Sequence, residues 1–380
     1  MHKHGIHFLL LTVAGLVVLG LVMLFSTSAF ARDSHGDIYF FVKRQAMWLC
    51  VGLAVAVFAA RVDYHFWQRT WWIWFGGACV LVLLCFVPGI GLRINGSSRW
   101  INLGFGVLQP SELAKIGALF FLAWWYSRFE VESRGFLMGL LAPMAILSLL
   151  MIPILLEVDM GNTALIGATA LGVMFVAGAA LRWLMLLGIA GLGGGWFLAM
   201  NISERQGRLI AFLNPEKYRL GEGLQQWQAL IAFGSGGIEG LGLGEGRQKM
   251  LYLPYAHTDF IFPMIGEELG LRITLLTVGG YLLICLCGSL VASNARDRFG
   301  LLLGIGAVMM ISLQAVVNIG VTTSLLPNKG MPLPFISYGG SNLVVCLFMI
   351  ALLVNIHLQG RPLVPRLAPA LVRARVQPRL

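Results

Sequence analysis

Apolar segments long enough to cross a membrane occupy most of this 380-residue chain. Hydrophobic residues make up 58% of it and charged residues only 12%, against roughly half and a quarter in a soluble globular protein. A helix needs about 20 apolar residues to cross a hydrocarbon core of about 30 Å. The sequence therefore predicts an all-α, polytopic membrane protein, and about ten transmembrane helices can be read from it. They are residues 7–31, 44–61, 71–88, 112–126, 136–157, 162–180, 183–200, 267–291, 300–324 and 342–359.

The placement of basic residues predicts how these helices are oriented. Lys and Arg gather beside the cytoplasmic ends of transmembrane helices. If both termini are cytoplasmic, most of the arginines between spans fall on the inner side, although the first outer connection is also basic. We therefore expect one membrane domain over 1–360, with its first span retained as an anchor. We also expect a disordered cytoplasmic tail over 361–380 and a large extracytoplasmic catalytic loop at 201–266, between helices seven and eight.

Three polar connections then face the outer side, and the first lies between the third and fourth spans. Its run Gln109-Pro110-Ser111-Glu112 is typical of a helix start, with Ser111 as a cap and Glu112 at the positive end of the helix dipole. Lys115 lies on the same helical face as Glu112. One interpretation is a capped helix with an internal ion pair. The other is that Arg99, Glu112 and Lys115 face a polar cavity, because charges at a membrane margin need a partner or a charged ligand.

The second connection is the loop 201–266. It begins with a basic amphipathic segment, Ser203 to Tyr218, which is expected to lie along the membrane surface. The glycine-rich segment 221–246 favours tight turns over a helix interior. The loop ends in His257-Thr258-Asp259, followed by Glu267 and Glu268 at the start of the next span. Ionisable residues beside a bilayer are functional candidates. Asp259 is the candidate general base, with His257, Thr258 and Glu267 nearby; the alternative is that Asp259 caps a short helix.

The third connection, 326–341, contains three prolines and three glycines, so it cannot form a continuous helix. Irregular backbone at membrane depth is tolerated where it lines a water-filled cavity or is buried in protein. The polar residues Lys329, Ser337, Tyr338 and Ser341 are therefore further candidates for a cavity that opens to the outer side.

Several of these motifs, in this order, resemble those of the SEDS family (shape, elongation, division and sporulation), the polytopic peptidoglycan polymerases typified by FtsW and RodA. The resemblance covers about Phe25 to Gln359. The motifs that carry it are Asn95-Gly96-Ser97-Ser98-Arg99-Trp100-Ile101, Gln109-Pro110-Ser111-Glu112-Leu113-Ala114-Lys115, Trp227-Gln228-Ala229-Leu230-Ile231-Ala232, His257-Thr258-Asp259-Phe260-Ile261-Phe262, Glu267-Glu268-Leu269-Gly270 and Leu333-Pro334-Phe335-Ile336-Ser337-Tyr338-Gly339-Gly340-Ser341. The run Asn328-Lys329-Gly330 is similar to the division-type pattern. Tyr255 and Val158 depart from the family, since an acid and a proline are common at these positions.

The resemblance implies a peptidoglycan glycosyltransferase that polymerises lipid II at the outer face of the cytoplasmic (inner) membrane, during division at the septum. In this reaction a sugar 4-hydroxyl attacks the anomeric carbon of a lipid-linked chain, and undecaprenyl pyrophosphate leaves. Asp259 would take the proton. The expected substrate-binding residues are Arg99, Glu112, Lys115, His257, Thr258, Glu267, Lys329, Ser337, Tyr338 and Ser341.

The resemblance also implies ligands and partners. They are lipid II, the nascent glycan strand, a class B penicillin-binding protein transpeptidase and other division proteins, with no nucleic acid. No metal-binding cluster is visible, so a divalent cation (Mg or Mn) would be held with the substrate pyrophosphate, and no organic cofactor is expected.

Two other functions remain open from the residues alone. A flippase or transporter of lipid-linked precursors also needs many helices, a cavity and intramembrane charges. Transporters more often place their ion sites near the bilayer centre in two related halves, whereas here the charges gather on one side. A purely structural division scaffold is the third interpretation. The alternative role of Arg99 is to anchor its loop at the lipid headgroups.

Overall fold

The computed structural model describes residues 2–28, 37, 39–94, 97–102, 104, 106–201, 203–250 and 252–360. Ten long helices in this part of the chain coincide with the ten predicted spans, which confirms the helical membrane fold. They are α1 (His2–Ser28), α2 (Phe40–Arg61), α3 (Tyr64–Leu84), α4 (Pro110–Arg128), α5 (Ala142–Leu156), α6 (Met160–Val176), α7 (Leu181–Met200), α10 (Ile261–Ala292), α11 (Arg298–Thr322) and α12 (Gly340–Gly360). The tail predicted at 361–380 lies outside the described residues.

Six of the described helices are both long and apolar enough to cross a membrane on those criteria alone: α1, α2, α10, α11, α12 and the helical segment Leu137–Leu156. The last joins a short π-helical stretch, η3 (Leu137–Leu141), to α5. A short 3-10 helix, η2 (Glu132–Arg134), precedes it. The chain is thus a multi-pass membrane protein.

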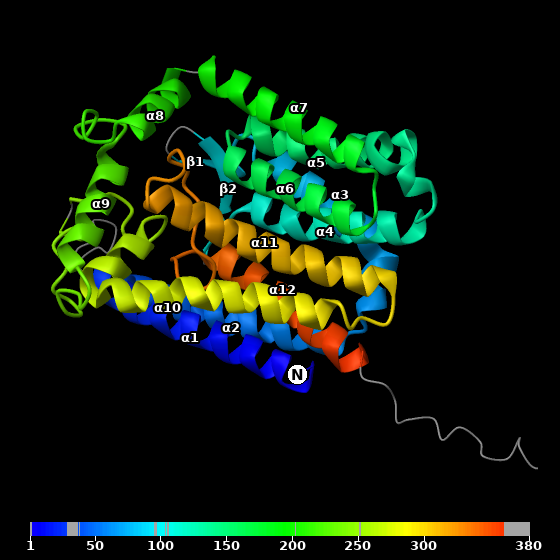
Figure 1. Ribbon diagram of the computed structural model, residues 1–380, viewed down its shortest axis with the longest axis horizontal. Helices are drawn as coiled ribbons and strands as arrows, with labels where there is room; N and C mark the ends of the chain where they lie inside the picture. Colours follow the sequence, from blue (N-terminus) through cyan, green and yellow to red (C-terminus); the bar gives the residue numbers. More distant parts are fainter. Residues whose placement is uncertain are drawn as a thin grey trace, which may run out of the picture.

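The long helices form one bundle whose two ends differ (Figure 1). The start of α1 and the end of α12 lie at one end. The short helices α8 (Ser203–Leu213) and α9 (Leu224–Gly236) and a small sheet lie at the other end. Both described ends of the chain are therefore on the same side of the bundle, as the sequence predicts for an even number of crossings.

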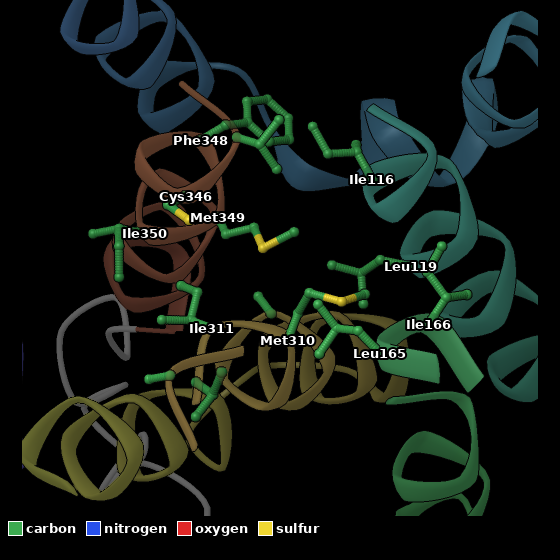
Figure 2. Packing of buried hydrophobic residues seen from close by; sticks show 14 of the residues in the cluster. Ile116, Leu119, Leu165, Ile166, Met310, Ile311, Cys346, Phe348, Met349 and Ile350 are labelled. Carbon is green, nitrogen blue, oxygen red and sulfur yellow. The ribbon is translucent and has the colours of Figure 1, made fainter. Parts of the chain in front are cut away.

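The centre of the bundle is packed where α4, α6, α11 and α12 meet (Figure 2). Leu119 of α4, Ile166 of α6 and Ile311 of α11 are almost fully buried there. Small residues let the helices approach closely, as is usual in membranes. A Cβ atom added to Gly306 of α11 would lie 2.2 Å from Leu119 Cδ1. The central helices are therefore fixed against one another.

A three-stranded antiparallel sheet is the feature that the all-α prediction lacked. Strands β1 (Gly91–Ile94), β2 (Ser97–Asn102) and β3 (Val107–Leu108) follow one another in sheet order, with a register shift at Leu92/Arg93. They occupy the predicted polar connection between the third and fourth spans. The sheet matters because β2 carries Arg99.

The loop 201–266 is more ordered than its glycine content indicates. The amphipathic prediction for its start is confirmed by α8, but the prediction of turns throughout 221–246 is wrong, because α9 is a helix that includes Gly234 and Gly236. Gly236 packs directly on α10, since an added Cβ would lie 2.0 Å from Gly266 O. Within α10 the backbone is non-helical at Gly270, with φ 74°. The first part of α10 is therefore separated from its membrane part by a kink.

Candidate active site

A polar cavity of about 660 Å³ opens at the end of the bundle that carries the sheet, α8 and α9. Its wall combines β2, the start of α6, α8, the turn before α9 and the two irregular segments 254–260 and 328–332. All three predicted polar connections contribute to it. Of the eleven predicted site residues, five line this cavity: Arg99, Thr258, Asp259, Lys329 and Tyr338.

Asp259 lies in the turn just before α10 and is partly buried. The N-cap residue of α10 is Phe260, without a side-chain cap, so the alternative that Asp259 caps this helix does not hold. Burial raises the pKa of the Asp259 carboxyl to about 6; the Arg99 cation opposes this shift and the Asp159 carboxylate adds to it. A carboxyl group with a pKa near neutrality suits a general base.

Two neighbours hold Asp259 in place. The Asn318 side chain of α11 donates hydrogen bonds to Asp259 O at 2.8 Å and to Met331 O at 2.6 Å, which joins the two irregular segments. Gly330 lies against the carboxylate, because an added Cβ there would be 2.5 Å from Asp259 Oδ2. The sequence analysis did not include Asn318 or Gly330 among the candidate site residues. A polar residue such as Asn318 within an apolar span is, however, a signal for a functional site.

Arg99 is anchored by backbone carbonyls. Its Nε donates to Glu157 O at 3.2 Å and its Nη2 to Val158 O at 3.1 Å. Val158 has φ 67°, a left-handed conformation that is strained for a β-branched residue and closed to proline. The departure from the family proline at this position therefore fits the local backbone. The strained turn at Val158 directs the carbonyl groups of Glu157 and Val158 toward the Arg99 guanidinium. Arg99, held in this way, lines the cavity.

Asp159 is a cavity residue that the sequence reasoning missed. Its carboxylate accepts hydrogen bonds from Gln109 Nε2, Ser111 Oγ and Asn162 Nδ2, at 3.1, 2.9 and 2.9 Å. It also caps α6 through Asn162 N. The signal was an Asp at the start of an apolar span, which is a helix-cap pattern. Ser111 does not cap α4 as predicted: the N-cap residue is Gln109, and the Ser111 hydroxyl is used on Asp159.

The placement of Glu112 and Lys115 on the cavity wall needs correction, because both side chains are buried behind it. Each is 1% exposed, and Lys115 Nζ donates to Glu112 Oε1 at 2.8 Å. Asn342 Nδ2 donates a further hydrogen bond to Glu112 Oε2, and Lys115 Nζ also donates to Gln314 Oε1. Gln314 Nε2 in turn donates to Pro332 O at 2.8 Å. The pair is thus an internal one, connected through Gln314 to the segment that carries Lys329 and Gly330.

Three further predicted residues surround the cavity without lining it. The His257 ring stacks on Phe41 at 4.3 Å between centroids. Ser337 Oγ donates to Thr258 O at 2.6 Å and accepts from Leu333 N, and Ser341 Oγ accepts from Gln109 N at 3.2 Å. These contacts fix the chain around the cavity, and none of the three side chains lines the cavity itself.

Glu267 is also placed differently from the prediction. It is fully buried, and its carboxylate accepts hydrogen bonds from the backbone N–H groups of Arg247 and Gln248. The adjacent Glu268 pairs with Lys249 at 2.7 Å and accepts from Ser26 Oγ of α1. These two acids attach the segment 244–249 to the first part of α10, directly after Asp259.

Within the described chain, no group of three His, Cys, Asp or Glu side chains is arranged to hold a metal ion. The Asp159 carboxylate oxygens already accept hydrogen bonds from the protein. A divalent cation in this cavity would have phosphate groups of a substrate among its ligands.

Comparisons with a family model and with individual proteins point to the same family. The family described as "Cell cycle protein", covering FtsW, RodA and SpoVE, matches residues 7–361. The chain is 40% identical over 357 residues to the "Probable peptidoglycan glycosyltransferase FtsW" of Geobacter metallireducens, which covers 93% of this chain and 95% of the relative. It is 37% identical over 360 residues to "Stage V sporulation protein E" of Bacillus subtilis, covering 91% and 95%.

Two solved structures share the fold. A chain from a structure described as "Structural coordination of polymerization and crosslinking by a peptidoglycan synthase complex" has a TM-score of 0.76 at 26% identity, covering 93% of this chain and 98% of that one. The rod shape determining protein RodA of Thermus thermophilus has a TM-score of 0.65 at 27% identity, covering 92% and 95%.

Proposed function

We propose that this chain, which belongs to the FtsW, RodA and SpoVE family of cell cycle proteins, is a peptidoglycan glycosyltransferase that polymerises lipid II. The observation that carries the proposal is the cavity in which a carboxyl with a pKa of about 6 and the cations Arg99 and Lys329 are brought together. This combination suits an attack by a hydroxyl with a phosphate leaving group. The cavity lies at the same end of the bundle as α8 and α9, which we place outside the membrane.

In the proposed reaction, Asp259 accepts the proton of the attacking sugar 4-hydroxyl as the new glycosidic bond forms at the anomeric carbon. General-base catalysis of this kind contributes about 10²–10⁴-fold to a rate. The bond to undecaprenyl pyrophosphate breaks in the same step, and negative charge builds up on the departing oxygen. Thr258 and Tyr338 line the cavity beside the base and are proposed to contact the sugars.

Arg99 and Lys329 are proposed to bind the leaving pyrophosphate. A guanidinium donates directed hydrogen bonds to phosphate oxygens, while an ammonium acts as a point charge. Arg99 already donates from Nε to Glu157 O and from Nη2 to Val158 O and Ser97 Oγ, so it is oriented before the substrate arrives and offers its Nη1 group to a phosphate oxygen. A divalent cation held with the substrate pyrophosphate would supply further positive charge there. Preorganised charges of this kind stabilise the transition state without rearrangement.

Other parts of the proposal rest on the relatives. We place the protein in the cytoplasmic membrane at the septum, with both termini in the cytoplasm. We also propose a class B penicillin-binding protein transpeptidase as its partner, because a similar chain comes from a peptidoglycan synthase complex. The direct substrate contacts are assigned to Arg99, Thr258, Lys329 and Tyr338. Positioning roles go to the six buried or peripheral residues Glu112, Lys115, His257, Glu267, Ser337 and Ser341.

The test is polymerisation of fluorescent lipid II by the purified full-length protein in vesicles, with its proposed partner added in parallel. Wild-type protein should make glycan ladders, and Asp259→Asn should reduce their rate by about 10²–10⁴-fold, because the amide keeps the size but cannot take a proton. Equal rates for the two proteins would show that Asp259 is not the base. Movement of label across the vesicle without any polymer would identify a flippase instead.

A further inference from the structure

The charged side chains of the cavity fall into two groups. Arg99 and Lys329 belong to the first group, beside Asp259: the charge of Arg99 acts on that carboxyl, and Lys329 precedes Gly330, which touches it. Arg208 of α8 and Glu222 of the turn before α9 belong to the second. Arg208 pairs with Glu222 between α8 and the turn before α9, away from the segment 328–332 that touches Asp259. Of the three basic side chains that line the cavity in the described chain, Arg208 is the one outside the surroundings of the base.

Arg208 makes a weak, exposed ion pair with Glu222, which lies beside the anchored start of α9. Its Nε donates to Glu222 Oε2 at 3.3 Å, and the side chains are 46% and 49% exposed. An exposed pair of this kind contributes about 0–1 kcal/mol, so an anionic ligand can replace the carboxylate at little cost. Glu222 itself packs on α8, because an added Cβ at Gly207 would lie 3.3 Å from Glu222 Cγ.

The support comes from α9. Gln225 accepts a hydrogen bond from Asn328 Nδ2 at 2.6 Å, and Gln226 Nε2 donates to the carbonyls of Val321 and Leu326. These bonds fix the start of α9 to the segment that carries Lys329. Glu222 lies two residues before this anchored helix start.

The proposed reaction needs two phosphate sites. Each of its two substrates is linked to lipid through its own pyrophosphate. One pyrophosphate leaves from the anomeric carbon and must lie beside the base. The other stays on the attacking molecule, two sugar rings away from the hydroxyl that reacts, and so it must bind a cation that is not beside Asp259.

We propose that Arg208 binds the pyrophosphate of the acceptor, the lipid-linked molecule that keeps its pyrophosphate through the reaction, while Arg99 and Lys329 serve the donor. Glu222 holds the guanidinium toward the cavity when no acceptor is bound and releases it to the phosphates. This inference rests on the proposed glycosyltransferase function and adds a second substrate site to it.

The test uses two lipid II analogues that separate the roles. A 4-O-methyl lipid II has no attacking hydroxyl and can only donate, whereas an analogue with carbon in place of the anomeric oxygen can only accept. Together they give a single transfer product, so KM can be measured for each. Arg208→Ala should raise the KM of the acceptor analogue about 10- to 100-fold, the range expected for charge-assisted hydrogen bonds. It should leave the KM of the donor analogue and the rate at saturation close to wild type.

Glu222→Gln distinguishes ligand binding from a structural contact. Because Glu222 competes with the phosphates for Arg208, its amide should lower the acceptor KM or leave it unchanged. If Arg208 only fastens α8 to Glu222, both variants lose the same contact, and both should raise the KM together. That parallel rise, or a change confined to the donor KM, would overturn the proposal.

The matched control is Arg272→Ala, which removes an exposed arginine paired with Glu239 outside the cavity, the two side chains being 69% and 71% exposed. It should leave both KM values unchanged. Polymerisation of unmodified lipid II by the wild-type protein, measured alongside, reports on the glycosyltransferase function by itself. A wild type that polymerises lipid II while Arg208→Ala keeps its acceptor KM would reject the second site and retain the function.

Discussion

At the scale of single residues, the pKa of Asp259 leads to a prediction about pH. A base works only when ionised, and a pKa raised to about 6 means that activity is lost as the pH falls through about 6 and is full above it. The initial rate of lipid II polymerisation should therefore rise across this range and then level off. Since the Arg99 cation lowers this pKa, Arg99→Gln should move the midpoint to higher pH. A midpoint near 4, the usual value for an Asp, would contradict the assignment.

Gly330 gives a second prediction at this scale. A methyl group at this position would lie 2.5 Å from Asp259 Oδ2, closer than real contacts allow, so Gly330→Ala should displace the carboxylate. We expect a loss of polymerisation of at least about tenfold with little change in thermal unfolding, because Gly330 is exposed. The control is Gly339→Ala, whose added carbon meets Asn342 Cβ at an ordinary 3.7 Å. Equal activity of the two variants would show that the turn adjusts freely.

At the scale of elements, the buried Glu112–Lys115 pair connects α4 to α11 and to the irregular segment at 331–332. Breaking a buried pair by removing one partner costs about 3–5 kcal/mol, since the other charge is left in the interior. Lys115→Ala should therefore lower the unfolding temperature and abolish polymerisation. Thermal unfolding in detergent measures the first effect. The exposed pair of Lys43 and Asp37 is the control, because Lys43→Ala should change neither property. A stable, active Lys115→Ala protein would show that the pair does not support the site.

The elements also show what the sequence could predict. Ten helices followed from apolar length, because a span must satisfy all its backbone groups by itself. The three polar connections that meet at the cavity followed from the same topology. The sequence did not predict which of the charged residues would face the cavity. Glu112 and Arg99 both carry charge near one membrane margin, but only packing against α11 and α12 decides that Glu112 is buried. The helix α9 was missed because Gly236 provides a close contact with α10 instead of a turn.

At the scale of the whole molecule, the two ends of the bundle should be separated by the membrane. Glu222 lies at the end with α8 and α9, and Arg134 lies in the connection between α4 and α5, at the opposite end (Figure 1). In a background where exposed Cys50 is replaced by Ala, Glu222→Cys should react with an impermeant thiol reagent added outside intact cells. Arg134→Cys should react only after the membrane is opened. The reverse pattern would invert the orientation and place the cavity in the cytoplasm.

The contact between Gly240 and Gly270 has a consequence for how this chain can evolve. An added Cβ on Gly240 would lie 2.7 Å from Gly270 N, and one on Gly270 would lie 2.4 Å from Gly240 N. Both residues also have positive φ, which disfavours any side chain. A substitution at either glycine would be unfavourable even if the other had already changed. We therefore expect neither position to tolerate another residue. Sequence change in this loop should therefore accumulate around a fixed pair, and a library of variants selected for growth should recover only glycine at both.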